Sequence, residues 1–162
     1  MCQLSKNNPM PFRRIIPLVI LLMCSYRGSA QDSDAEAVKS VVRQLFEGMK
    51  RGDSALVKAV FHQTAVLQSV ATSKTGEIKV HTMPAQDFIT AVGKPHTDVW
   101  DERIEFGQVL VDGPMASVWT PYKFYLGEKF SHCGVNSFQL YKSADGWKVL
   151  YLVDTRRKEN CP

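Results

Sequence analysis

The fold is decided by one stretch of alternating residues, Met115-Ala-Ser-Val-Trp-Thr-Pro-Tyr-Lys-Phe-Tyr-Leu-Gly-Glu-Lys-Phe-Ser-His-Cys-Gly-Val-Asn-Ser-Phe-Gln-Leu140. Apolar and polar side chains alternate along much of it, which is the period of a β-strand. Gly127-Glu128 divides the stretch, and glycine at the first loop position is typical of a type II′ hairpin. The stretch therefore predicts two long antiparallel strands, 115–126 and 129–142.

Two further strands flank this hairpin and complete a four-stranded meander. Residues 99–111 lead into an Asp112-Gly113 turn, and residues 147–155 follow a turn at residues 143–146. Each segment is rich in β-branched and aromatic residues and is bounded by turn-forming residues. The C-terminal half of the chain is therefore expected to be an antiparallel sheet.

The N-terminal half is predicted to be mainly helical. Val38, Val42 and Leu45 belong to an apolar stripe at helical spacing, which predicts a helix over about 34–51 with a capping box at residues 33–36. Gly52 suits the end of that helix. A short helix capped by Asp53 or Ser54, strands at 65–71 and 77–82, and a third helix that begins at Pro84 and ends at Gly93 follow. The order predicts α+β architecture with helices on one face of the sheet.

Hairpin register decides which side chains share a face of the sheet. Two-residue loops at Asp112-Gly113 and Gly127-Glu128 make opposing residue numbers add up to 225 and 255, and we take 288 for the last hairpin. One face then collects the residues that suggest a ligand pocket: Phe106, Trp119, Tyr125, His132, Asn136 and Asp154. The other face includes Tyr122, Gln139, Trp147 and Tyr151. A β-bulge in either hairpin would move residues to the opposite face.

These pocket residues have both chemical and structural interpretations. Asp154 between apolar walls suits a general acid or base, and His132 can share that proton transfer. Asn136 can donate to an oxyanion, and Trp119 can stack on a ring. The structural alternatives are a core role for His132 and Trp119, and an ion pair of Asp154 with Arg156 or Arg103.

Residues 1–30 have the layout of a secretory signal peptide. A basic start precedes a short apolar run, and Gly28-Ser29-Ala30 supplies small residues for cleavage after Ala30. The apolar run is too short for a typical membrane span. Cys24 offers an alternative, a lipoprotein, because residues 21–24 resemble a loose lipobox. We expect an exported chain, periplasmic or secreted, that has no membrane association after the leader is removed.

Charge and cysteine content narrow the partners of the remaining 31–162 domain. The leader holds four basic and no acidic residues, so sixteen basic side chains remain against sixteen acidic ones. This balance argues against nucleic-acid binding. Cys133 and Cys161 can form one disulfide or remain two thiols. No phosphate-binding, zinc-binding or nucleophile motif is present in the sequence, so we expect no metal and no cofactor.

The sequence resembles the nuclear transport factor 2-like (SnoaL-like) superfamily in the order of its predicted elements, in Phe61-His62 after the second helix and in Asp145-Gly-Trp-Lys-Val149. Two further segments, residues 127–140 and Asp154-Thr-Arg-Arg157, look more specifically like small exported bacterial members described as "putative lumazine-binding". The resemblance implies a single domain over 31–162. It also implies a cone-shaped roll, in which three N-terminal helices pack on a strongly curved, mainly antiparallel sheet of about six strands. A homodimer through the sheet is expected as well.

The resemblance places a pocket between the helices and the concave sheet, and two functions suit it. The first is an exported small-molecule-binding domain. The second is an isomerase, cyclase or dehydratase-type enzyme that uses Asp154 or His132 as acid or base. A third possibility, a partner-binding module of an envelope assembly, would use the opposite face of the sheet.

Overall fold

The structure is a computed structural model that describes the backbone of residues 16–73 and 75–162, and side chains from Gln31 onward. The chain divides into two units, residues 1–33 and 34–162. The expected signal peptide, including Cys24 and the cleavage site at Ala30, falls on residues whose side chains lie outside the described part. Within the described part, no helix is both long and apolar enough to cross a membrane.

Three helices precede the main part of the sheet. α1 (Ile16–Arg51) contains the predicted 34–51 helix, but its helical backbone begins well before Ser33, so the expected capping box starts no helix here. A capping residue marks a helix start only where the preceding backbone is non-helical. α2 (Ser54–Val60) is capped by Asp53, whose carboxylate accepts from the backbone N–H groups of residues 55 and 56. α3 (Ala85–Val92) begins after Pro84, as predicted.

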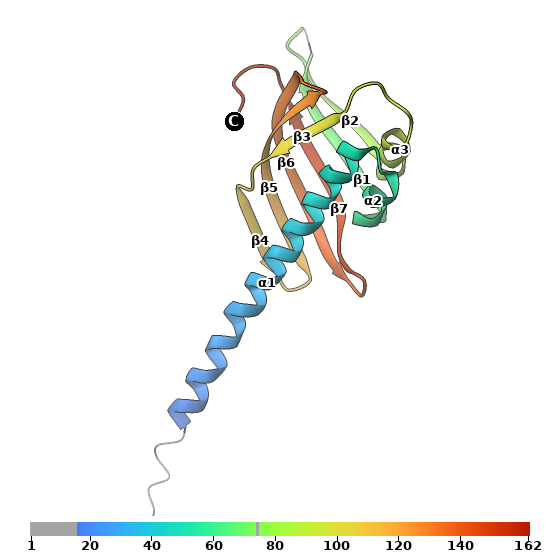
Figure 1. Ribbon diagram of the computed structural model, residues 1–162. Coiled ribbons are helices and arrows are strands. Elements are labelled where there is room, and N and C mark those ends of the chain that lie inside the picture. The colour runs from blue at the N-terminus through green and yellow to red at the C-terminus, as the bar shows by residue number, and fades with distance from the viewer. Residues whose placement is uncertain (1–15, 74) are drawn as a thin grey trace, which may run out of the picture. The chain divides into compact units, whose positions relative to one another are not determined.

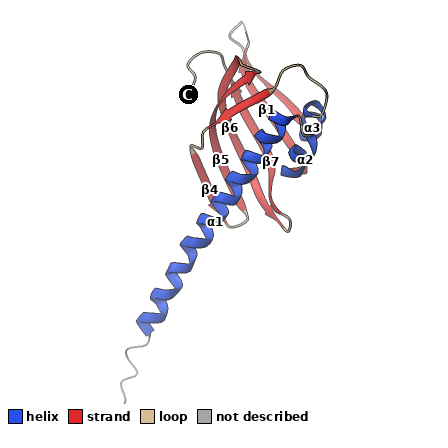
Figure 2. Cartoon of the chain, in the orientation of Figure 1, coloured by secondary structure: helices blue, strands red, loops and turns tan. Residues whose placement is uncertain are grey.

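In the described residues, seven strands form one curled sheet, one strand more than expected. The strands are β1 (Phe61–Thr72), β2 (Ile78–Pro84), β3 (Trp100–Ile104), β4 (Gln108–Asp112), β5 (Met115–Leu126), β6 (Lys129–Ser143) and β7 (Gly146–Arg156). They lie side by side in one sheet, drawn in red in Figure 2, in the order β2-β1-β7-β6-β5-β3, and β4 also pairs with β5. All pairs are antiparallel except β1 with β7. The mainly antiparallel α+β architecture is confirmed.

The additional strand arises because the predicted strand 99–111 is split in two. Pro121, in the middle of β5, has no N–H to donate to a neighbouring strand. Its carbonyl accepts from Glu105 N at 2.9 Å, and the carbonyl of Trp119 accepts from Gly107 N at 2.9 Å. β3 consequently pairs with the last part of β5, and β4 pairs with its first part.

The core lies between the helices and one face of the sheet. In Figure 1, the C-terminal part of α1 crosses that face, and α2 and α3 lie beside it near β1 and β7. Val38, Val42 and Leu45 are essentially fully buried, so the predicted apolar stripe of the first helix is confirmed. Phe46 meets Phe138 of β6 edge to face, with ring centroids 6.1 Å apart. These contacts fix α1 against the centre of the sheet.

The central hairpin has the predicted turn but not the predicted register along its length. Gly127 has φ of 57°, and Leu126 lies opposite Lys129, as expected for a two-residue loop. A register shift between Phe124 and Tyr125 then changes every later pair, so that Trp119 lies opposite Ser137. Because side chains alternate, this shift of one residue turns residues 115–124 to the other face of the sheet.

The other two hairpins also differ from the expected register, and the last one changes an expected face. Asp112 pairs with Met115, so the first loop is Gly113-Pro114 and not Asp112-Gly113. A register shift between Gln139 and Leu140 of β6, where it pairs with β7, brings Trp147 to the inner side. Tyr122 and Trp147, both expected on the outer face, are only 2% and 4% exposed.

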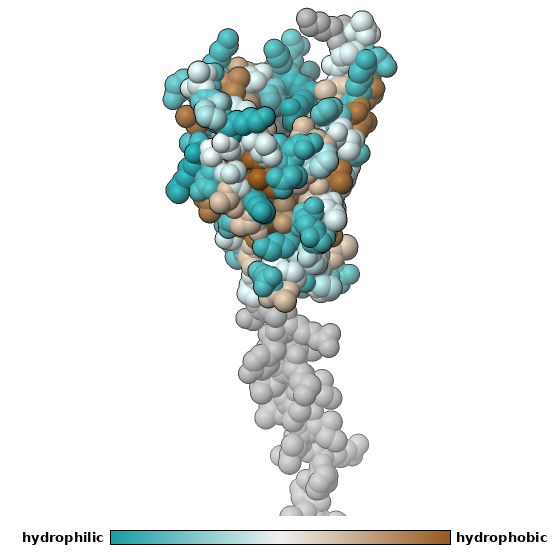
Figure 3. All heavy atoms as spheres, turned by 90° about the vertical axis from the view of Figure 1, so that its right-hand side faces the viewer, coloured by the Kyte–Doolittle hydropathy of each residue, from teal (hydrophilic) through white to brown (hydrophobic). Residues whose placement is uncertain are grey.

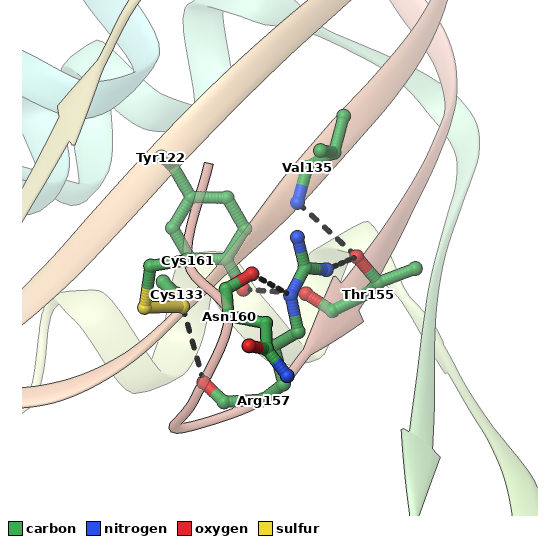
Figure 4. Close-up of a disulfide and its surroundings, with 7 residues drawn as sticks. All are labelled: Tyr122, Cys133, Val135, Thr155, Arg157, Asn160 and Cys161. Carbon is green, nitrogen blue, oxygen red and sulfur yellow. Dashed lines mark hydrogen bonds between the residues drawn. A yellow bond between two sulfur atoms is a disulfide. The ribbon is translucent and has the colours of Figure 1, made fainter.

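A disulfide between Cys133 and Cys161 ties the C-terminal segment to β6, with the Cα atoms 5.6 Å apart (Figure 4). Cys133 also exchanges two backbone hydrogen bonds with Arg157. The next residue, Gly134, has no room for a side chain, because an added Cβ would lie 1.7 Å from the carbonyl oxygen of Thr155. The bridge, the backbone pair and this close approach together fix the end of β7 against β6.

Candidate functional site

A cavity of about 950 Å³ lies between the helices and the concave face of the sheet. Its size falls within the range typical of small-molecule sites. Its apolar walls come from two helices and five strands: Leu45, Phe46, Met49, Leu67, Val80, Met83, Phe88, Ala91, Trp100, Phe124, Leu126 and Leu152. On the side seen in Figure 3, hydrophilic residues surround scattered apolar ones. Apolar side chains are therefore more concentrated in the cavity than on that surface.

Polar side chains from four strands also line this cavity: Ser69 of β1, Glu102 of β3, His132 and Asn136 of β6, and Asp154 and Arg156 of β7. We call these six residues the polar cluster. Glu102 and Asn136 lie on strands that are not hydrogen-bonded neighbours. Their side chains meet because the sheet is curved. Three of the six predicted pocket residues, His132, Asn136 and Asp154, therefore do line one cavity.

Asp154 is buried and heavily hydrogen-bonded. One carboxylate oxygen accepts from the hydroxyl of Ser69 at 2.5 Å. The other accepts from the Tyr122 hydroxyl at 3.0 Å and from Arg156 Nε at 2.8 Å. Three of the roughly four acceptor positions of the carboxylate are thereby taken, so little of it is left for a ligand proton. Asp154 therefore joins β1, β5 and β7, and it is poorly placed to act as a base.

Glu102 is the second carboxyl of the cluster and has a different environment. Asn136 Nδ2 donates to its Oε1 at 2.8 Å, and in the described part of the chain this is its one side-chain hydrogen bond. Burial raises the pKa of Glu102 to about 7, with a smaller contribution from the nearby negative charge of Asp154; the Asn136 hydrogen bond opposes the shift. Glu102 is thus the carboxyl in this cavity that gains and loses a proton near neutral pH.

His132 lies beside two aromatic rings. Its ring centroid is 4.9 Å from that of Phe124 and 5.8 Å from that of Tyr122. Burial lowers the pKa of His132, and the positive charge of Arg156 lowers it further. The ring therefore serves at neutral pH as an uncharged hydrogen-bonding group.

The other three predicted pocket residues are not among those that line the cavity. Trp119 is 49% exposed on the outer face, because the register shift in the central hairpin reverses its direction. Tyr125 lies beyond that shift, where its ring packs on Phe130 and under the guanidinium of Arg103. Phe106 packs against the core, with Arg43 over its ring.

Sequence reasoning missed Glu102 as a site residue, although a local signal was present. Glu102 alternates with Trp100 and Ile104, so a strand places all three on one face, and two of them are large apolar residues. A carboxyl on an apolar strand face is a candidate for a shifted pKa. Ser69 and Tyr122 carried no such signal, because their partner Asp154 is more than thirty residues away in sequence.

In the described residues, no group of three or more His, Cys, Asp or Glu side chains is placed to hold a metal ion. Within the apolar walls, the polar cluster presents the imidazole of His132 and two carboxyls with different surroundings, Glu102 and Asp154. This arrangement can enclose a small ligand and exchange a proton with it at Glu102.

A curled sheet with helices over a cavity defines the class of nuclear transport factor 2-like proteins, which have a cystatin-like fold. Residues 33–152 match the family described as "Putative lumazine-binding", and the chain belongs to that family. The expected resemblance is thereby confirmed. A comparison with curated proteins finds no match.

Solved structures support the same fold at low sequence identity. A protein with a cystatin-like fold from Novosphingobium aromaticivorans is 9% identical, with 93% of this chain and 94% of that chain covered and a TM-score of 0.63. A protein of unknown function from Shewanella baltica is 16% identical, with coverages of 76% and 94% and a TM-score of 0.57. A "putative dehydratase" from Streptomyces avermitilis is 16% identical, with coverages of 78% and 97% and a TM-score of 0.58.

Glu102 predicts a specific dependence of stability on pH. Its pKa in the folded state, about 7, lies above the ordinary value of 4.5, so the folded state holds this proton more tightly. The resulting stabilisation is present below pH 4.5 and is lost as the pH rises to 7, by up to about 3 kcal/mol. Glu102→Gln removes the titrating group and retains an oxygen for Asn136. The free energy of unfolding of this variant, relative to that of the unsubstituted protein, should therefore increase as the pH rises from 4.5 to 7.

Urea denaturation of both proteins at several pH values measures this difference. Glu105→Gln, which removes an exposed carboxylate just beyond β3, calibrates the effect of losing a surface charge. A stability difference between the Glu102→Gln variant and the unsubstituted protein that stays constant from pH 4 to pH 8 would contradict the prediction.

Proposed function

We propose that this chain is a small-molecule-binding domain whose ligand occupies the cavity between the helices and the sheet. The observation that supports this most directly is the combination of about 950 Å³ of space, largely apolar walls and a cluster of hydrogen-bonding groups on one wall. Ligand sites have this composition, because apolar walls supply affinity and a few polar groups fix orientation.

The walls favour a ligand that is flat and partly aromatic. Phe88, Trp100 and Phe124 bring aromatic rings to the cavity from α3, β3 and β5. The polar cluster supplies hydrogen-bonding groups for the polar edge of such a molecule, including the carboxyl of Glu102 and the imidazole of His132. The family description names lumazine, a flat bicyclic heteroaromatic molecule, which makes it a suitable first probe.

Filling the cavity should abolish binding. Ala91 of α3 lines the cavity, so the phenyl ring in Ala91→Phe takes up space that the ligand needs. We expect a flat heteroaromatic ligand, from a panel that begins with lumazine, to bind the unsubstituted protein at least about tenfold more tightly than this variant. Isothermal titration calorimetry provides the measurement.

Thr90→Phe provides the matched control, because it adds the same ring to the exposed side of the same helix and should leave affinity unchanged. If Ala91→Phe folds normally and binds the same panel as tightly as the unsubstituted protein, the ligand does not occupy this cavity.

A second candidate function is proton transfer on a bound carbonyl compound, and the raised pKa of Glu102 favours it. A carboxyl that titrates near pH 7 inside an apolar cavity is suited to act as a general base or acid. Glu102 replaces Asp154 as the candidate base, because Asp154 already accepts three hydrogen bonds and Glu102 accepts one from a side chain. One structural neighbour is titled a "putative dehydratase", and general acids and bases of this kind suit a dehydration.

Deuterium exchange into small ketones and enones in D₂O, followed by NMR, tests this candidate. The unsubstituted protein should accelerate exchange at carbons next to the carbonyl, and Glu102→Gln should reduce the acceleration by roughly a hundredfold. Glu105→Gln should retain it. Exchange that persists undiminished in the Glu102→Gln variant would assign the proton transfer to another group.

Export and a homodimer through the sheet also stay predictions. The leader pattern supports export, and so does the Cys133–Cys161 disulfide, since disulfides persist in oxidising compartments. The outer face of the sheet exposes Leu110, Met115 and Trp119, which suits a second copy of the chain.

N-terminal sequencing of the exported protein should show that it begins at Gln31. In sedimentation, the protein should have twice the monomer mass. Trp119→Asp should reduce that mass to the monomer value, while Glu105→Gln should not. A chain that retains residues 1–30, or that sediments as a monomer at high concentration, would contradict the corresponding prediction.

A further inference from the structure

Glu102, in the polar cluster, has no ion-pair partner among the described residues: the positive charge of Arg156 lowers its pKa, but Arg156 pairs with Asp154. Asp154 pairs with Arg156 at 2.8 Å, which balances one acidic and one basic charge of the polar cluster. Lys79, which also lines the cavity, pairs with Glu77 at 3.1 Å. In the described residues, Glu102 contacts an amide instead, and no ion pair is formed with it.

The other titratable groups around Glu102 do not supply that partner. His132 on β6 has its pKa lowered by burial, and the Tyr122 hydroxyl on β5 donates to Asp154 and to the carbonyl of Thr155. His81 of β2 and Asp87 of α3 line the cavity with exposed side chains. The cavity residues of α1 are apolar. Glu102 and Asp87 are therefore the acidic groups of the cavity for which the described residues show no ion pair.

We propose that the ligand of this cavity carries a basic nitrogen, as an amine or a protonated heterocycle, and that Glu102 is its counter-ion. The proposal deepens the binding function proposed above and rests on it. A carboxylate that loses its water is costly unless a cation accompanies it. A cationic ligand would supply that charge inside the same apolar walls.

The aromatic residues of the cavity suit the same class of ligand. Phe46, Phe88, Trp100 and Phe124 all line it, and cations are attracted to the faces of such rings. An anionic ligand would instead lie near two acidic groups, Glu102 and Asp154, and would be repelled by their negative charge. Charge complementarity therefore favours a ligand with an apolar or aromatic body and one positive charge.

This assignment fixes the sign of the pH dependence of binding. Glu102 must lose its proton before it can pair with a cation, and burial holds its pKa at about 7. Affinity for a cationic ligand should therefore rise between pH 5 and pH 8, by roughly tenfold per unit below the pKa. A neutral ligand that accepts a hydrogen bond from the protonated carboxyl would show the opposite trend.

Three probes that share an indole ring separate these possibilities: tryptamine is cationic, tryptophol is neutral and indole-3-propionate is anionic. Calorimetric titration of the full chain at pH 8 should show tryptamine bound at least about tenfold more tightly than tryptophol. Glu102→Gln should remove this preference without weakening tryptophol binding. Glu105→Gln, which removes an exposed carboxylate outside the cavity, should retain it.

Each outcome decides the inference. Preference for tryptamine that rises with pH and is lost in Glu102→Gln supports it. Equal or tighter binding of tryptophol or indole-3-propionate overturns it and leaves the binding function standing. Preference for tryptamine that survives in Glu102→Gln overturns the role of Glu102. Failure of all three probes, together with the flat heteroaromatic panel, overturns the binding function as well. Circular dichroism of each variant establishes that the fold is intact.

Discussion

One additional residue in β6 determines which side chains face the cavity. Tyr125 pairs with Phe130 and Phe124 pairs with His132, so Ser131 lies between them without a partner of its own in the ladder. Because strand side chains alternate, this bulge reverses every residue of β5 from Phe124 back to Met115. Val118, Thr120 and Tyr122 consequently point inward, and Trp119 points outward. The cavity wall and the outer surface both depend on this single shift.

The inward direction of Tyr122 lets the sheet accommodate a buried carboxylate. Asp154 receives hydrogen bonds from Tyr122, Ser69 and Arg156, which come from three strands. A buried charge is tolerated when donors of this kind compensate it. Glu102 lies in the same cluster with an amide as its partner. Its pKa is therefore raised, and the protonated, uncharged form is favoured. Two carboxyls of similar chemistry thus have different roles because of their neighbours.

The solved structures share the fold of this chain but few of its residues. Structures that are 9% to 16% identical share the curled sheet and its helices. Fold similarity at this level carries no function by itself. The disulfide at Cys133 and the close approach at Gly134 fix the end of β7, which carries Arg156 into the polar cluster. The functional argument therefore rests on the side chains of this cavity.

The sequence alone determined the elements of the fold. The apolar stripe of the first helix, the Asp53 cap, the Gly127 turn and the alternating strands each follow from local patterns, because helix and strand periods are properties of short segments. The sequence also indicated that His132, Asn136 and Asp154 share one face, since β6 and β7 pair with the expected parity there. Tertiary structure alone decided which residues join them. A bulge is one unpaired residue that no periodic pattern reveals, and Glu102 reaches Asn136 because the sheet curls, which depends on the packing of the whole domain.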